Sequence, residues 1–205
     1  MRRKGWAVAT DIPRIIENLR AAYDPRDRTL IVVGGGGGQF IEYSRLARQV
    51  LAVDHDAEAI RALQEKLHKA GLEGIFAPVL ADFFDVRLRG DAVLFEFCLH
   101  EIPDPAAAIR HAQTLTSDLI IIDHWPGSEW TFFTAEDEKV AASWASLASF
   151  AFRKKEKYDA VHFFHDYGEL YQRVKAQGDL SLARIEKFRS QKDFSIPLSY
   201  GIALI

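Results

Sequence analysis

The feature of the sequence that most constrains the fold is a run of five glycines, residues 34–38, directly after the apolar and β-branched residues 29–33. Such an apolar run is typical of a buried strand, and consecutive glycines end a strand in a tight turn. Glycine lets the backbone approach a bound molecule closely, and the helix after such a turn presents free N–H groups. We therefore expect a strand, a turn and a helix, with a ligand at the turn.

Further apolar runs alternate with stretches that carry apolar residues at helical spacing, as in parallel strands joined by crossover helices. The sequence predicts an α/β fold: a doubly wound, mostly parallel seven-stranded sheet with helices on both faces and a C-terminal antiparallel hairpin. The expected parallel strands are residues 29–33, 50–53, 75–80, 92–99 and 119–122, and the expected hairpin strands, with no helix between them, are residues 182–189 and 196–205.

One domain over residues 1–205 is expected, because no repeat or linker divides the chain. It includes a lead-in helix within residues 1–25 and a substrate-side segment, residues 124–180. With 26 Lys and Arg against 29 Asp and Glu, the net charge of −3 offers no positive field to nucleic acid. No apolar stretch is long enough to cross a membrane, and a single cysteine, Cys98, without an export signal favours the cytoplasm.

Polar residues at the carboxyl ends of the strands form the candidate site, because open parallel sheets bind ligands there. Asp54 ends the second expected strand, 20 positions after Gly34. An acid at this place accepts hydrogen bonds from the ribose hydroxyls of a bound nucleoside. The alternative is that Asp54 caps the next helix, but Asp56 already stands at the capping position.

The glycine turn distinguishes two classes of nucleoside cofactor. A dinucleotide turn has the pattern G-x-G-x-x-G, and Gln39 or Phe40 stands at its third glycine position, depending on the first glycine chosen. Gly34, Gly36 and Gly38 match G-x-G-x-G instead. Together with the stretches LAVDHD, ADFF and DAVLFEFCLHEIPDP and the terminal hairpin, this pattern resembles the class I S-adenosylmethionine-dependent methyltransferases over residues 30–205.

The resemblance implies that S-adenosylmethionine is the cofactor and that the reaction is methyl transfer to a small-molecule acceptor. It implies that Gly34, Gly36 and Gly38 approach the methionine part and the ribose of the cofactor. Asp54 is implied to hold the ribose hydroxyls, and His55 is implied to lie against the adenine.

Residues after the third and fourth strands complete the implied cofactor site. Asp82 and Phe83 are implied to meet the amino group and the face of the adenine, and Glu96 and Phe97 to border the methionine part. The family commonly has an acid two residues before the first glycine, where this chain has Val32. Glu96 either replaces that acid or forms a buried ion pair with an arginine, because a carboxylate in an apolar strand is costly without a cation.

Histidines beside acids are the candidates for catalysis. Methyl transfer needs alignment of the reactants, and it needs a base only where the acceptor loses a proton. His100, next to Glu101, and His124, next to Asp123, follow the fourth and fifth strands. Either imidazole could act as a base near neutral pH, or the two histidines have structural roles.

The same strand ends could also form a metal site. Glu101, Asp123 and His124 offer oxygen and nitrogen ligands, and the HxxH spacing of His162 and His165 would place both on one side of a helix. Acids at strand ends are common without a metal, and HFFH fits an amphipathic segment equally well. We therefore expect no metal site.

Aromatic residues after the fifth strand bear on the acceptor. Trp130, Phe132 and Phe133, with Trp6 and Tyr23 from the lead-in segment, either roof an acceptor pocket or lie under a loop. Their position favours an apolar or aromatic small molecule as the partner, with no nucleic acid and no membrane. Residues 140–152 and the terminal strands are the candidate contact surfaces of an oligomer.

Two other functions stay open from the sequence. A protein of the same fold that binds the cofactor weakly, or that binds a partner without catalysis, is favoured by Val32 in place of the usual acid. A nicotinamide-dependent oxidoreductase is disfavoured by Gln39 and by the terminal hairpin.

Overall fold

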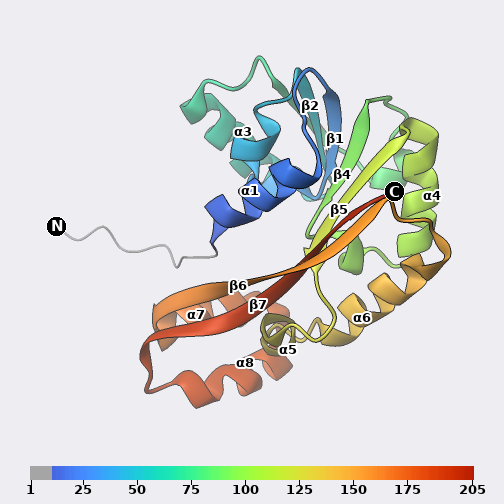
Figure 1. Cartoon of the computed structure of the whole chain (residues 1–205). Helices are drawn as coiled ribbons and strands as arrows, with labels where there is room; N and C mark the ends of the chain where they lie inside the picture. The colour runs from blue at the N-terminus through green and yellow to red at the C-terminus, as the bar shows by residue number, and fades with distance from the viewer. Residues whose placement is uncertain (1–10) are drawn as a thin grey trace.

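A seven-stranded sheet forms the centre of the molecule (Figure 1), and the structure, a computed structural model, describes residues 11–205. The strands lie in the order β3-β2-β1-β4-β5-β7-β6. The first five run parallel, and β7 pairs antiparallel with both β5 and β6. The strands are β1 (Thr29–Val33), β2 (Gln49–Asp54), β3 (Phe76–Leu80), β4 (Ala92–Glu96), β5 (Asp118–His124), β6 (Lys154–Asp166) and β7 (Lys192–Leu204).

Helices cover both faces of the sheet, because its central strands are apolar on both sides. The helices are α1 (Ile12–Ala22), α2 (Ile41–Ser44), α3 (Ala57–Ala70), α4 (Pro105–Leu115), α5 (Glu129–Phe133), α6 (Asp137–Ser146), α7 (Tyr167–Val174) and α8 (Asp179–Ile185). In β1, Leu30 and Val32 belong to the core under α1, α2 and α3, whereas Ile31 and Val33 belong to the core under α4 and α6. This arrangement confirms the predicted fold class, and β1 to β5 overlap the predicted apolar runs. The prediction for β4 is too long, because the strand ends at Glu96 and Leu99–Glu101 form a 3₁₀ turn.

The C-terminal part differs from the sequence prediction in one element. Residues 182–189, expected as a strand, belong to α8 and the turn after it, and the partner of β7 is β6. Leu182, Ile185 and Phe188 contact one small core at a spacing of three residues, which suits a helix. The sequence pattern hides β6, because it is an edge strand whose first half is charged and largely exposed.

β6 and β7 extend beyond β5 as a long two-stranded ribbon, the β6–β7 ribbon (Figure 1). α5, α7 and α8 lie against it and enclose a third, small core, which consists of Trp130, Phe133, Phe164, Leu170, Val174, Ile185, Phe188, Ile196 and Leu198. Burial of these apolar side chains fixes α7 to the ribbon.

The lead-in helix α1 begins as the sequence predicts. The Asp11 carboxylate accepts a hydrogen bond from the Arg14 backbone N–H at 3.3 Å, and Ile15 and Leu19 are fully buried. Trp6 lies outside the described residues. Within residues 11–205, no helix is both long and apolar enough to span a membrane.

Gly201 of β7 lies against two tryptophan rings and offers a test of this packing. A methyl group on Gly201 would lie 2.6 Å from Trp125 Cε3 and 2.7 Å from Trp144 Cζ2. We expect Gly201→Ala to lower the free energy of unfolding by about 1–3 kcal/mol, because overpacking displaces these rings. Urea unfolding measures this change. Gly74→Ala is the control, since its methyl group meets nothing within 4 Å, and equal midpoints for the two variants would contradict the packing.

Candidate active site

Two adjoining cavities open at the carboxyl edge of the sheet. The larger cavity has a volume of about 520 Å³ and the smaller cavity about 240 Å³. Gln39, Phe97 and Glu101 line both, so these side chains stand at the junction. The larger cavity is lined by Val33, Gly34, Gly37, Gln39, Val53, Asp54, His55, Ala81, Asp82, Phe83, Phe84, Glu96, Phe97, Cys98, Glu101, Ile102 and Pro103.

The glycine turn borders the larger cavity. Gly34 has φ +76° and Gly38 has φ +59°, in the left-handed region that favours glycine. A methyl group on Gly36 would lie 2.6 Å from both Asp54 Oδ2 and Ala59 Cβ, so the turn is too close to its neighbours for a side chain. Of the three predicted glycines, Gly34 lines the cavity, whereas Gly36 and Gly38 shape the turn.

Asp54 and His55 both line the larger cavity. Asp54 Oδ2 accepts a hydrogen bond from the Gly36 N–H at 3.0 Å, and Oδ1 accepts one from the Asp56 N–H at 3.0 Å. A carboxylate has about four acceptor positions, so lone pairs remain for a ligand. His55 is exposed, and its Nδ1 lies 3.8 Å from Asp54 Oδ1. Asp54 is thus held in place, and His55 lies at the cavity mouth.

Asp82 and Phe83 line the same cavity after β3. The Asp82 carboxylate accepts a hydrogen bond from the Phe84 N–H at 2.8 Å and so begins a 3₁₀ turn. The buried Phe83 ring lies edge-on to Phe95 and His111, with centroid distances of 5.3 and 5.0 Å. The structure therefore brings these two predicted residues to the cavity that Asp54 faces.

Glu96, the last residue of β4, is a buried carboxyl that lines the larger cavity. Burial raises the pKa of Glu96 to about 8, although the backbone N–H groups of Phe40 and Gln39 and the charge of Lys66 favour the ionised form. No arginine or lysine of residues 11–205 forms an ion pair with it within 4 Å. The alternative of a buried ion pair with an arginine is therefore not realised among these residues.

Phe97 lies where the two cavities meet, and its backbone is strained. Its φ of +48° lies in the left-handed region, which bulky side chains rarely adopt. The ring stacks on Phe40 at 5.9 Å and contacts His124 at 4.8 Å and Tyr200 at 6.3 Å. Strain of this kind persists where the surrounding structure enforces it, often at functional sites.

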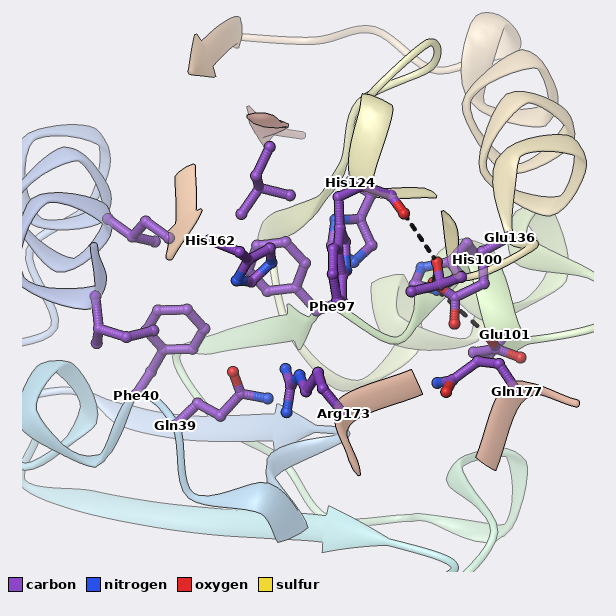
Figure 2. A pocket seen from close by; sticks show the side chains of 15 residues that line it. Gln39, Phe40, Phe97, His100, Glu101, His124, Glu136, His162, Arg173 and Gln177 are labelled. Atoms are coloured by element: carbon purple, nitrogen blue, oxygen red, sulfur yellow. Dashed lines mark hydrogen bonds and ion pairs between the residues drawn. The ribbon is translucent and has the colours of Figure 1, made fainter. Parts of the chain in front are cut away.

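His100 lines the smaller cavity (Figure 2) and is bonded to the buried Asp123. Its Nδ1 lies 2.6 Å from Asp123 Oδ1, its backbone N–H donates to Oδ2 at 3.0 Å, and its Nε2 lies 3.5 Å from Glu101 Oε1. Burial lowers the pKa of His100, but the hydrogen bond and the charge of Asp123 outweigh it, so the pKa is raised. An imidazole oriented by a carboxylate is the usual arrangement of a general base.

His124 faces the smaller cavity beside His100, with ring centroids 5.4 Å apart. Burial lowers the pKa of His124 to about 3. Its Nδ1 is buried and has no hydrogen-bond partner in the part of the chain that the structure describes. The imidazole is therefore neutral near pH 7 and a weak base.

Two glutamates lie near His100 in the smaller cavity. Glu101 Oε2 lies 2.8 Å from Lys139 Nζ, and Glu136 Oε2 accepts a hydrogen bond from Thr134 Oγ1 at 2.6 Å. Ligand atoms of His100, Glu101 and Glu136 lie within 4.8 Å of one another. Because both carboxylates already have partners, we assign no metal to this group.

His162 and His165 lie on β6 rather than on a helix, so they do not share one side. His162 is buried in the wall of the smaller cavity, with its ring 4.1 Å from Trp130, and burial lowers its pKa to about 3. His165 is exposed, and its Nδ1 lies 2.9 Å from Asp193 Oδ1. The HxxH spacing therefore does not form a joint site.

Of the aromatic residues predicted to roof an acceptor pocket, Trp130 lines the smaller cavity. Three others that the structure describes do not line it, so for them the first of the two alternatives is not realised. Phe133 is buried in the small core, Phe132 lies beneath the Arg184 guanidinium at 4.2 Å, and the Tyr23 hydroxyl donates to Asp118. The smaller cavity is consequently more polar than the sequence indicates.

Several residues of the smaller cavity carry no signal in the sequence. Arg173 lies on α7, and Gln177 lies in the turn after it. The β6–β7 ribbon brings both to the sheet edge. Their spacing of four residues, which would place them on one side of a helix, is the one hint in the sequence. The full lining is Ile12, Ile15, Gln39, Phe40, Phe97, His100, Glu101, His124, Trp130, Thr134, Glu136, His162, Arg173, Gln177 and Leu198.

Comparisons with known proteins agree with this architecture. Residues 31–118 match a family described as a methyltransferase domain. No curated protein sequence matches the chain.

Solved structures with the same fold include two named as methyltransferases and one named as a decarboxylase. A proposed methyltransferase from Bacillus halodurans is 12% identical, with a TM-score of 0.66 and coverage of 95% of this chain and 97% of the other. A SAM-dependent methyltransferase from Aquifex aeolicus is 16% identical, with a TM-score of 0.60 and coverage of 96% and 90%. Precorrin 8w decarboxylase from Methanobacterium thermoautotrophicum is 11% identical, with a TM-score of 0.62 and coverage of 97% and 92%.

The matched residues contain β1 to β4, the glycine turn, Asp54 and Glu96, and they end where β5 begins. The fold agrees with the solved structures over nearly the whole chain. Residues 31–118 are therefore similar to a methyltransferase domain, and the chain as a whole has the fold of these solved methyltransferases.

Proposed function

We propose that this protein transfers the methyl group of S-adenosylmethionine, bound in the larger cavity, to a small molecule bound in the smaller cavity. The observation that carries the proposal is that the two cavities meet at Gln39, Phe97 and Glu101. Catalysis of a displacement depends chiefly on holding the two reactants in contact and in line. Two cavities that meet at defined side chains provide such alignment.

The larger cavity fits the cofactor in shape and in polar groups. Gly34 and Gly37 line the cavity without side chains, and Asp54 has free acceptor positions for the ribose hydroxyls. Asp82 and Phe83 would hold the adenine, with His55 at the mouth of the cavity. When bound, S-adenosylmethionine supplies a methyl group whose bond to sulfur breaks as the acceptor bonds to the carbon.

Glu96 would bind the α-amino group of the cofactor. The family commonly has an acid for this role at the position where this chain has Val32. The Glu96 carboxyl is buried, faces the larger cavity and has no cationic partner among the described residues. A bound ammonium group would favour the ionised carboxylate and offset the cost of its burial. Phe97, next in the chain, would border the methionine part and keep it in line with the smaller cavity.

His100 would act as the base when the acceptor has a proton to lose. Asp123 orients the imidazole through Nδ1 and leaves Nε2 on the side of Glu101, which lies at the junction. The proton would pass from the acceptor to Nε2. His124, with a pKa of about 3, would stay neutral and shape the wall.

The ribose role of Asp54 can be tested by its removal. We expect Asp54→Ala to weaken S-adenosylhomocysteine binding by about 1–3 kcal/mol, because hydrogen bonds to a charged acceptor are lost. Isothermal titration calorimetry measures the affinity, and Asp56→Asn, which keeps the helix cap, is the control. Equal affinities for Asp54→Ala and the wild type would remove the ribose assignment. Binding of NADH but not of S-adenosylhomocysteine to the wild type would overturn the proposed function.

Glu96 makes the stability of the free protein depend on pH. Its pKa is about 8 in the folded protein, against an ordinary value of 4.5, so the folded state keeps a proton that the unfolded state releases. Stability is then lost as the pH rises from 4.5 through 8. Between pH 6 and pH 9, we expect the wild type to lose about 2 kcal/mol more stability than Glu96→Gln in urea unfolding.

The same Glu96→Gln variant tests the amino-group role. We expect its S-adenosylhomocysteine affinity to fall about tenfold or more, because a charged partner is replaced by an amide. Lys69→Gln, an exposed change on α3, serves as the control. An unchanged affinity, together with the expected stability profile, would show that Glu96 is a buried acid with no part in cofactor binding.

The His100–Asp123 pair can be tested by NMR titration of the histidine side chains. We expect His100 to titrate above the usual histidine pKa and Asp123→Asn to lower its pKa, because the charge that favours the imidazolium is removed. His124 is the internal control and should stay neutral down to about pH 4. A His100 pKa that does not respond to Asp123→Asn would contradict the pairing.

A further inference from the structure

The smaller cavity contains an arginine with no acidic partner. Arg173, on α7, forms no ion pair within 4 Å and no hydrogen bond with any residue from 11 to 205. It is the one arginine or lysine among the described residues that line this cavity. Arg173 is exposed to solvent, and its guanidinium stays charged at any physiological pH, so it can pair with an anionic ligand in the cavity.

Other arginines of the same part of the chain are paired. Arg184 lies 3.0 Å from Asp137, and Arg189 lies 2.7 Å from Glu186. Arg153, before β6, lies 2.9 Å from Asp118. These three arginines thus have acidic partners, on α6, on β5 and after α8, whereas Arg173 has none and lines the cavity.

The surroundings of Arg173 lack a negative charge close enough to neutralise it. Figure 2 shows its side chain reaching from α7 into the cavity toward Gln39 and His162, with His100, Glu101 and Glu136 grouped on the other side. Burial by the surrounding protein lowers the pKa of Arg173, and the charge of Glu136 opposes this effect without an ion pair. Glu136 and Glu101 already bind Thr134 and Lys139.

We propose that the acceptor carries a carboxylate, and that the guanidinium of Arg173 binds it in the smaller cavity. This inference rests on the proposed methyl transfer and names its substrate class. A guanidinium matches a carboxylate in shape and charge, through two parallel N–H···O hydrogen bonds. The amides of Gln39 and Gln177, which also line the cavity, can donate further hydrogen bonds.

One carboxylate fits this cavity better than a phosphate. A phosphate ester carries close to two negative charges, while the cavity offers one arginine and has two glutamates in its wall. A carboxylate carries one charge and leaves the rest of the acceptor to the aromatic rings of Trp130 and Phe97. The carboxylate at Arg173 and the reacting atom near the junction then lie at different ends of the acceptor.

The test uses 4-hydroxybenzoate, its neutral analogue 4-hydroxybenzamide and 4-hydroxyphenyl phosphate as probes, each titrated with and without saturating S-adenosylhomocysteine at pH 8. We expect the wild type to bind the benzoate at least tenfold more tightly than the amide or the phosphate. Arg173→Gln should abolish this preference, and Arg173→Lys should keep part of it. Lys175→Gln, an exposed change two residues away, is the control and should bind like the wild type.

Four results would overturn the proposal: equal binding of benzoate and amide, an unchanged benzoate affinity in Arg173→Gln, tighter binding of the phosphate, or no binding of the benzoate. Each variant is also titrated with S-adenosylhomocysteine alone, which should bind the wild type and Arg173→Gln equally, because Arg173 does not line the larger cavity. If S-adenosylhomocysteine does not bind the wild type, the proposed function is refuted. The probe titrations without S-adenosylhomocysteine still test the role of Arg173.

Discussion

The register of β7 holds the two cavities side by side. Its residues 200–204 pair with β5 and so belong to the main sheet, while residues 192–199 pair with β6 alone and carry the small core. Because side chains alternate along a strand, a slip of one residue would turn Ile196 and Leu198 away from the small core and release α7. Arg173, Gln177 and His162 reach the sheet edge only in the observed register.

Burial decides which groups of the site are charged. Glu96, His124 and His162 are all shifted toward their neutral forms by burial, whereas Asp123 favours the charged form of His100. At the smaller cavity, the remaining charged groups are the His100–Asp123 pair, Glu101, Glu136 and Arg173.

The sequence predicts the half of the site that depends on strand ends. A parallel sheet places the carboxyl ends of its strands at one edge, so Asp54, Asp82, Glu96 and His100 could be assigned to one site from the apolar runs alone. The other half depends on how the β6–β7 ribbon folds back, and the charged edge strand β6 hides that from any hydrophobic pattern. For this reason Arg173 and Glu136 could not be found, and the sequence could not decide that Phe132 lies at the surface and Phe133 in the small core.

The two cavities are built from different parts of the chain. The matched methyltransferase domain, residues 31–118, contains the junction residues Gln39, Phe97 and Glu101 and almost the whole larger cavity. Most residues of the smaller cavity come from α1 or from the chain after residue 118, including His124, Trp130, His162 and Arg173. A fold of this kind also occurs in a protein named a decarboxylase, so the shared sheet does not set the chemistry of the second ligand. The β6–β7 ribbon can therefore change in sequence and alter the acceptor while the glycine turn, Asp54 and Glu96 keep the larger cavity intact.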